Sequence, residues 1–439
     1  MSESVSTKSL PHVGPGTPMG RFMREYWLPA LMSRELERGG APVRLMLLGE
    51  KLVAFRDGKG AVGVIDERCP HRGVSLFLGR NEDAGLRCIY HGWQFGANGR
   101  CVDMPSVPAS QRFQGKVRVN SYRTAERAGV VWVYMGQRTE APPLPAFEAT
   151  VLPDAEVSVY CVQRECNWLQ VAEGDLDTSH FGFLHMGSVD PEDMAPDNLL
   201  RHTAENRIPE FSMGDAPWGT SYAAFRGTTD GKTYWRFANF LFPCWTQSPQ
   251  GPFEDHIDAR AFVPMDDHHT MLFHFSWKRK SPALRAVDKH GKQLPGLRND
   301  NDFLPNTTDW FGRWRIRQSV ENDWEMSRSA QQDGTIYSGI DNLRVQDQAA
   351  VESMGYIVDH NLEQLAPTDQ MVARTRRRLV KAVQAYLAGT APPGVDDPAV
   401  FYAARSGYFL TDSRVGWQEA YQERMAQALH PAPLAVAAE

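Results

Sequence analysis

Two cysteines and two histidines in the first quarter of the chain have the spacing of a metal centre. Cys69 and His71 stand in Cys69-Pro70-His71, and after residues 72–87 follow Cys88 and His91 in Cys88-Ile89-Tyr90-His91. Two thiolates and two imidazoles offered from two loops form a four-ligand set that zinc accepts. A [2Fe–2S] cluster with two Cys on one iron and two His on the other uses the same set.

A second group of possible ligands lies in residues 173–185, which have the sequence EGDLDTSHFGFLH. Here Asp177, His180 and His185 follow one another at D-x-x-H-x-x-x-x-H spacing. We expect a helix that puts Asp177 and His180 on one face, where the carboxylate orients the imidazole. With one more carboxylate from elsewhere in the chain, the two histidines would complete the 2-His-1-carboxylate set of non-haem Fe(II) oxygenases.

Short strands and tight turns are expected around the first group. The pattern predicts strands over 43–48, 52–55, 61–65 and 129–134, with turns at 57–60 and 97–99. Ala141-Pro142-Pro143-Leu144-Pro145 marks a change of composition and a predicted domain boundary.

The rest of the chain mixes strands and helices. Strands are predicted over 222–225, 234–242 and 270–277, and an amphipathic helix over 369–387, whose apolar face holds Val372, Leu379 and Val383. Near the N-terminus, Thr17-Pro18 has the pattern of an N-cap followed by proline in the first helical position.

Composition sets the class and the expected compartment. The chain has 439 residues, 42% hydrophobic and 23% charged, which is typical of a globular protein with a substantial core. A net charge of −6 argues against a nucleic-acid binder. No apolar run suits a membrane helix and no signal core is present, so the cytoplasm is the expected location. Six cysteines are too few for a disulfide scaffold, and the four outside the first motif are expected to be buried small hydrophobes.

Together these motifs resemble the alpha subunits of Rieske non-haem iron aromatic ring-hydroxylating oxygenases, and more closely the phthalate 4,5-dioxygenase-like branch. The resemblance extends from about residue 17 to 390. Proline and glycine around the ligands fit a Rieske site better than a zinc ribbon, and neither loop has the extra cysteine of the high-potential respiratory type. The segments that carry the branch resemblance are 17–20, 26–27, 166–170, 346–347 and 352–355.

The resemblance implies an α+β fold. An all-β Rieske [2Fe–2S] domain is set beside a larger, helix-grip-like catalytic domain with an antiparallel sheet. We expect residues 1–41 to pack on the catalytic domain, 42–140 to form the Rieske domain and 141–439 to form the catalytic domain.

The resemblance also assigns roles. Cys69, His71, Cys88 and His91 would hold the cluster, and His180 and His185 the mononuclear iron. Asp177 would bridge the two centres by holding His180 and reaching His91 of a neighbouring subunit. Asp347 best matches the third iron ligand; the alternatives are Asp341 and, less well matched, Asp323 and Asp333. Glu173 departs from the family, because related dioxygenases carry asparagine there.

The implied function is that of a terminal oxygenase component, a homo-trimer or a multiple of one, with no nucleic-acid or membrane partner. It would hydroxylate an aromatic, carboxylated substrate with O2. Electrons from NAD(P)H would come through a separate flavin and ferredoxin-type reductase, because the chain has no dinucleotide fingerprint.

Several questions stay open at this level. The same iron site also suits O-demethylation of an aryl methyl ether, and a Rieske domain alone suits a non-catalytic electron carrier. Arg236 is the favoured partner of a substrate carboxylate, ahead of Arg207 and Arg226. Three aromatic residues near the second motif are either pocket or core, namely Trp168, Phe181 and Phe183.

Overall fold

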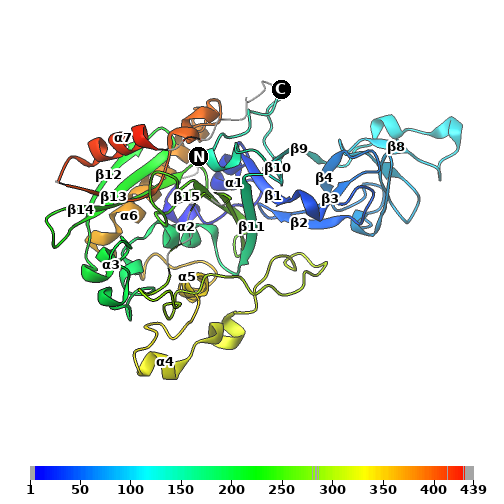
Figure 1. Cartoon of the computed structure of the whole chain (residues 1–439). Coiled ribbons are helices and arrows are strands. Elements are labelled where there is room, and N and C mark those ends of the chain that lie inside the picture. The colour runs from blue at the N-terminus through cyan, green and yellow to red at the C-terminus, as the bar shows by residue number, and fades with distance from the viewer. Residues whose placement is uncertain are drawn as a thin grey trace.

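The computed structural model describes residues 5–278, 280–281, 284, 286–412, 414–428 and 430. Within them the chain forms three antiparallel sheets and a set of helices (Figure 1). Two sheets build the elongated arm on the right of Figure 1, and the third builds the larger body on the left.

The first sheet has the strand order β1-β10-β9-β4-β3-β2. β1 pairs with β10, so an N-terminal strand closes one edge of a sheet made otherwise from residues 43–134. Its strands are β1 (Trp27–Met32), β2 (Val43–Leu47), β3 (Glu50–Arg56), β4 (Val62–Asp66), β9 (Ser121–Arg127) and β10 (Val130–Tyr134).

The second sheet is small and lies at the outer end of the arm (Figure 1). It has the order β5-β6-β7-β8, and the loops after β4 and β6 carry Cys69 and Cys88. A core of its own, which includes Phe55, Leu86 and Phe95, supports both loops. The strands are β5 (Arg80–Glu82), β6 (Gly85–Arg87), β7 (Gln94–Phe95) and β8 (Cys101–Asp103).

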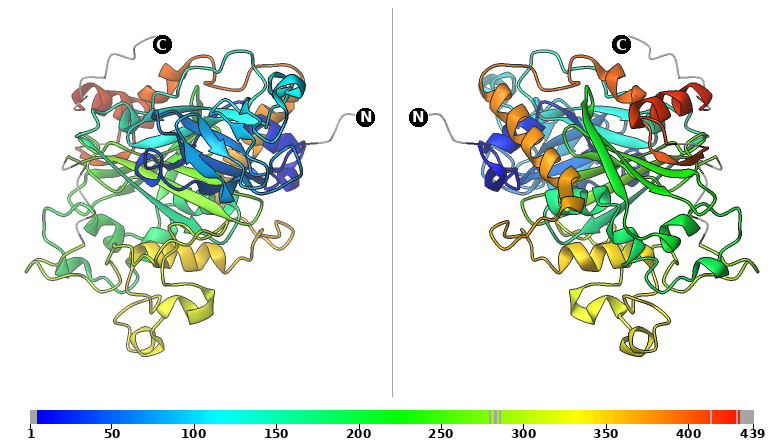
Figure 2. Two further views of the ribbon diagram at one scale, coloured as in Figure 1. Left: turned by 90° about the vertical axis from the view of Figure 1, so that its right-hand side faces the viewer. Right: turned by 90° about the vertical axis from the view of Figure 1, so that its left-hand side faces the viewer.

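The third sheet has the order β11-β17-β16-β15-β14-β13-β12, and β18 pairs with β14. Helix α6 lies across it, packed on β13 (Figure 2, right). The strands are β11 (Val157–Arg164), β12 (Glu210–Ala216), β13 (Gly219–Gly227), β14 (Thr233–Leu241), β15 (Trp245–Gln247), β16 (Asp258–Pro264), β17 (Thr270–Trp277) and β18 (Gly407–Thr411). The helices are α1 (Pro18–Met23), α2 (Trp168–Leu176), α3 (Arg201–Glu205), α4 (Arg328–Gln332), α5 (Leu343–Glu352), α6 (Gln370–Leu387) and α7 (Trp417–Gln427).

One hydrophobic core joins the first and third sheets. Trp132 of β10 stacks on Trp245 of β15 with ring centroids 5.7 Å apart, and on Phe275 of β17 at 5.9 Å. All three side chains are fully buried. Because this contact is apolar and extensive, the arm is held firmly on the body.

The predicted α+β class, with an all-β part beside a larger antiparallel α+β part, is confirmed. Each predicted strand and the long helix are present, with ends that differ by a few residues.

Thr17 caps α1 by accepting the N–H of Gly20, with Pro18 in the first helical position. β1, β5, β6, β9, β11, β12, β15, β16 and β18 were not predicted. The division at residues 41 and 140 stays a prediction. No helix in the described part of the chain has the length and apolarity needed to cross a membrane.

The apolar face of α6 packs on the third sheet and should contribute to stability. Leu379 is fully buried in the joint core, so Leu379→Ala is expected to lower the free energy of unfolding by about 2–5 kcal/mol. Urea denaturation followed by circular dichroism measures this change. The exposed Lys381→Ala on the same helix is the control, and equal denaturation midpoints for the two variants would contradict the role given to α6.

Candidate metal centres and active site

The two cysteine loops of the arm have the same backbone design. The N–H of Cys69 donates to the carbonyl of Val74 at 2.9 Å, and the N–H of Cys88 donates to the carbonyl of Trp93, also at 2.9 Å. Each loop therefore folds back on itself over the same number of residues and presents its cysteine and histidine in the same way.

A glycine closes each loop. Gly73 and Gly92 have φ values of +76° and +74°, and their N–H groups donate to the carbonyls of Cys69 and Cys88 at 2.8 and 3.0 Å. A side chain disfavours this left-handed conformation, so glycine is required four residues after each cysteine.

The four side chains suit an iron–sulfur cluster. The rings of His71 and His91 lie 4.4 Å apart, and His71 stacks on Trp93 at 4.3 Å. The Nδ1 atom of His91 is buried without a hydrogen-bond partner, as expected of a nitrogen whose lone pair is meant for a metal. Burial, together with the neighbouring Cys88, raises the pKa of the Cys69 thiol to about 11. A positive ion is needed to hold such a thiol as a thiolate.

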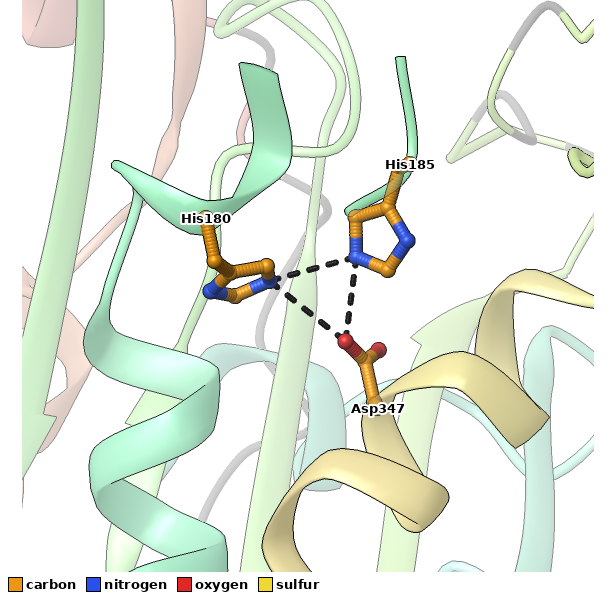
Figure 3. A group of neighbouring side chains, drawn as sticks. All are labelled: His180, His185 and Asp347. Carbon is orange, nitrogen blue, oxygen red and sulfur yellow. Dashed lines mark hydrogen bonds and ion pairs between the residues drawn. The ribbon is translucent and has the colours of Figure 1, made fainter. Parts of the chain in front are cut away.

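The second motif meets Asp347 in space (Figure 3). The Nε2 atoms of His180 and His185 lie 3.2 Å apart. Asp347 Oδ1 lies 3.4 Å from the first nitrogen and 3.0 Å from the second. The two histidines come from the turns after α2, and Asp347 comes from α5. Three ligand atoms from distant parts of the chain therefore converge on one point.

These separations fit a six-coordinate metal ion. Ligand bonds of about 2.1 Å at right angles put neighbouring donor atoms about 3 Å apart, and the three observed values lie close to this. Burial opposes the charge of both partners, but the surrounding groups outweigh it. The carboxylates of Asp177 and Asp347 raise the pKa of His180 to about 10, and both histidines lower the pKa of Asp347. The group thus favours a shared positive charge, which a metal ion would supply.

His180 is held by Asp177, but not through a helix. The Nδ1 atom of His180 lies 3.4 Å from Asp177 Oδ2. α2 ends at Leu176 and Asp177 is its C-cap, so the predicted helix through His180 is wrong. The Asp177 carboxylate accepts the N–H groups of Ser179, at 2.7 Å, and His180, at 3.3 Å. Such local bonds compete with helix continuation and turn the chain here.

His185 is held by Gln346, which was not predicted as a site residue. His185 Nδ1 lies 2.6 Å from Gln346 Oε1. The amide nitrogen of Gln346 donates to the carbonyls of Gly296, at 2.9 Å, and Ile340, at 2.7 Å. The amide orientation is therefore settled, and its oxygen accepts the Nδ1–H of His185. The Nε2 lone pair of His185 is left to face His180 and Asp347. Gln346 precedes Asp347, and this adjacency was the available signal.

The other carboxylates considered do not reach the triad. Asp341 accepts the N–H of Gly296 at 2.9 Å, and Asp323 and Asp333 are exposed. Glu173 faces α6, where it forms a two-bond ion pair with Arg376, with both distances 2.6 Å. The departure at position 173 therefore ties α2 to α6 and adds no charge at the metal.

Two of the three arginines considered bind backbone carbonyls. Arg207 donates to Gly182 O at 2.9 Å, and Arg226 to Asn206 O at 2.6 Å. Arg236 is 2% exposed, donates to Thr178 Oγ1 at 3.2 Å and leaves its Nη1 atom without a partner.

Arg236 also lies over the ring of Phe181 at 4.6 Å. Of the three aromatic residues left open, Phe181 is therefore at the site. Trp168 is buried in the core, and its indole N–H donates a hydrogen bond to Leu10 O at 3.3 Å. Phe183 is 48% exposed.

Two cavities meet at the triad. The larger, of about 190 Å³, has mostly apolar walls, among them Val162, Phe262 and Leu272. The smaller, of about 30 Å³, is lined by Phe181 and Arg236. Both include Asp177, His180 and Asp347 in their walls. The Asp347 carboxylate is 43% exposed because it faces these spaces.

The arm and the triad together define a Rieske oxygenase. Residues 26–123 match the model of the Rieske [2Fe–2S] domain, and residues 133–428 match that of the LigXa C-terminal-like domain. The chain belongs to this family of Rieske non-haem iron oxygenases.

Relatives cover nearly the whole chain. It is 52% identical to the 3-chlorobenzoate-3,4-dioxygenase oxygenase subunit of Comamonas testosteroni, over 97% of this chain and 99% of the relative. It is 33% identical to the phthalate 4,5-dioxygenase oxygenase subunit of Pseudomonas putida, over 94% and 93%.

Solved structures share the fold. A Pseudomonas putida NdmA variant with theobromine aligns with a TM-score of 0.55 at 18% identity, over 90% of this chain and 98% of the other. An oxygenase in complex with the ferredoxin of carbazole 1,9a-dioxygenase aligns with a TM-score of 0.53 at 18% identity, over 88% and 99%.

The protein is therefore the terminal oxygenase component of a Rieske oxygenase system. It uses a [2Fe–2S] cluster, a mononuclear iron and O2, as predicted. The alternatives of a non-catalytic electron carrier and a zinc protein are both rejected, because the two family models match the catalytic part as well as the Rieske domain. The assignment of individual residues as ligands stays a prediction.

The third ligand is tested by a matched pair of variants. Asp347→Asn is expected to lose the mononuclear iron, because one of its three proposed ligands is removed. The cluster absorption should remain, because Asp347 is not a cluster ligand. Asp341→Asn is expected to keep both. Iron analysis with visible spectroscopy measures this, and loss of mononuclear iron from the Asp341 variant alone would show that the wrong carboxylate was chosen.

The support of His185 is tested at Gln346. Gln346→Leu removes the acceptor of the Nδ1–H, so Fe(II) affinity measured by chelator competition is expected to fall about 10- to 100-fold. The exposed Gln331→Leu serves as control. Equal affinities in the two variants would mean that Gln346 does not orient the imidazole.

Proposed function

We propose that the chain hydroxylates a substituted benzoate to a cis-dihydrodiol. The observation that carries this proposal is 52% identity, over almost the full length of both chains, to an oxygenase subunit named for 3-chlorobenzoate. An apolar cavity of about 190 Å³ beside the triad suits one aromatic ring. The overall change takes up one O2, two electrons and two protons for each ring hydroxylated.

The proposed ligands are those singled out above. Cys69, His71, Cys88 and His91 would hold the cluster, and the triad of His180, His185 and Asp347 would hold the iron. A bound iron would supply open positions for O2, and the cluster would supply electrons one at a time. Asp177 and Gln346 hold the two imidazoles at their Nδ1 atoms, and the apolar walls of the larger cavity keep water away from the triad.

We propose that Asp177 bridges the centres of two subunits in a homo-trimer or a multiple of one. In one chain the arm holds the cluster loops away from α5 and the turns after α2, which carry the triad (Figure 1). The Asp177 side chain is 27% exposed, so part of it is free to meet a neighbouring His91. Ile89 and Tyr90 beside His91 are 57% and 52% exposed, which suits a protein contact there. A closed head-to-tail ring would supply it.

The electron donor is proposed to be a separate NAD(P)H-dependent reductase of the flavin and ferredoxin type. An oxygenase of this fold has been solved with a ferredoxin bound. All six cysteines are free and buried, which suits a reducing compartment such as the cytoplasm.

Arg236 is kept as a proposed substrate-binding residue. Its unpartnered N–H group belongs to a guanidinium that lines the smaller cavity beside the triad. A space of about 30 Å³ admits one small substituent and no ring. Arg236 would then donate to an electronegative group carried by the ring.

O-demethylation is the second candidate, because a 5,5'-dehydrodivanillate O-demethylase subunit is 28% identical over 91% of this chain. Its products, formaldehyde and a phenol, differ from a diol and separate the two reactions.

The proposed function is tested by turnover with a supplied reductase and NADH. The panel holds 3-chlorobenzoate, phthalate and a methoxybenzoate, and products are identified by mass spectrometry. A cis-diol from 3-chlorobenzoate is the expected product. Asp347→Asn, which should make none, is the control for uncoupled oxidation. Formaldehyde as the main product would favour demethylation, and no turnover of any aromatic acid would reject the substrate class.

A further inference from the structure

The two cavities at the triad differ in what they admit. A cavity of about 150 Å³ in another protein binds benzene, so about 190 Å³ is enough for one substituted ring. The smaller cavity, about 30 Å³, is far below that volume and has no room for a ring. The ring of an aromatic acid therefore belongs in the larger cavity, and its carboxylate needs a cationic partner in that wall.

Three arginines line the larger cavity, and two of them already have partners. Arg164 donates to Gln348 Oε1 at 2.6 Å and is 5% exposed. Arg260 forms ion pairs with Asp175 of α2 and with Asp258, which lies on β16 as Arg260 does. The charge of Arg260 is therefore balanced within the protein.

The third, Arg344, has no acidic partner in the described part of the chain. Its guanidinium lies over the ring of Tyr160 with its carbon 4.6 Å from the centroid. The Tyr160 hydroxyl lies 2.9 Å from His274 Nδ1, which fixes the ring beneath the charge. The guanidinium is thus positioned and half-buried, but not neutralised, at the wall of the cavity.

Arg344 lies on the same side of α5 as the triad residue Asp347. It stands three residues before Asp347 on α5, so the two side chains share a helix face about 4.5 Å apart along the axis. Both line the larger cavity. A carboxylate held at Arg344 would keep the carboxylated carbon on the far side of the ring and turn the opposite edge toward the triad.

We propose that Arg344 anchors the carboxylate of the substrate and thereby selects the ring carbons meta and para to it for hydroxylation. This inference rests on the proposed function. The smaller cavity at Arg236 then receives the second substituent of the ring. Arg344 is a specificity-determining residue that binds through a planar, two-bond contact, which glutamine cannot replace.

The test is binding without turnover. Iron-loaded oxygenase, without reductase and without O2, is titrated with 3-chlorobenzoate by calorimetry. Arg344→Gln is expected to raise the Kd for 3-chlorobenzoate about 100-fold. Arg344→Lys keeps the positive charge but cannot form the planar two-bond contact, and is expected to raise the Kd about 10-fold. The exposed Arg377→Gln is the matched control and is expected to bind as the parent does. Cluster absorption and iron content confirm that each variant is folded and loaded.

The outcomes separate this inference from the proposed function. If Arg344→Gln binds like the parent while Arg236→Gln loses binding, the carboxylate is held at Arg236 and the inference is overturned, with the substrate class intact. A turnover assay with reductase, NADH and O2 tests the choice of ring position. If the Arg344→Gln variant binds weakly yet hydroxylates the same carbons in that assay, Arg344 anchors the carboxylate without selecting the ring position, and that part of the inference is overturned. If the parent protein binds no benzoate, the proposed function fails and the inference with it.

Discussion

The meeting of one carboxylate oxygen with two imidazole nitrogens is the contact on which the rest of the catalytic part depends. The three atoms lie 3.0–3.4 Å apart, and such electron-rich atoms stay this close only if the backbone holds them and a positive charge lies between them. The backbone does so through capped helices. Asn342 caps α5 by accepting the N–H groups of Arg344 and Val345. Asn167 caps α2, and its amide donates to two distant carbonyls.

The two centres differ in how they are held. Each cluster loop is built by bonds among near neighbours in sequence, and a glycine at a left-handed position closes it. The triad instead joins segments from two parts of the catalytic sequence and relies on the long-range bond between His185 and Gln346. The shape of each cluster loop therefore depends on contacts near in sequence, whereas the triad requires the packed body.

This difference explains how much could be predicted from the sequence. The cluster motif is local, so its four residues and four of the six strands of the first sheet, β2, β3, β4 and β10, could be recognised directly. Asp347 could be preferred over Asp341 only through resemblance, because both stand near the start of α5 and tertiary packing decides between them. The helix expected through His180 was wrong because the Asp177 side chain binds the backbone N–H groups that a helix would use.

Other contacts had little or no signal in the sequence. The pairing of Glu173 with Arg376 joins two helices far apart in the chain, and Gln346 supports His185 through an amide that α5 carries into place. Arg344 was not singled out, because nothing in its neighbourhood tells a cavity arginine from a surface one. Periodicity finds helices and strands, but which side chains face the same space depends on how those elements pack.

The central claim is that one chain holds a Rieske cluster and a separate non-haem iron. The Mössbauer spectrum of protein purified with ⁵⁷Fe tests it directly. Cluster and mononuclear signals are expected in a ratio of about 2:1, with the two cluster irons distinct because one has thiolate and the other imidazole ligands. In Asp347→Asn the mononuclear signal should vanish and the cluster pair remain. A single class of iron, or loss of both signals together in that variant, would contradict it.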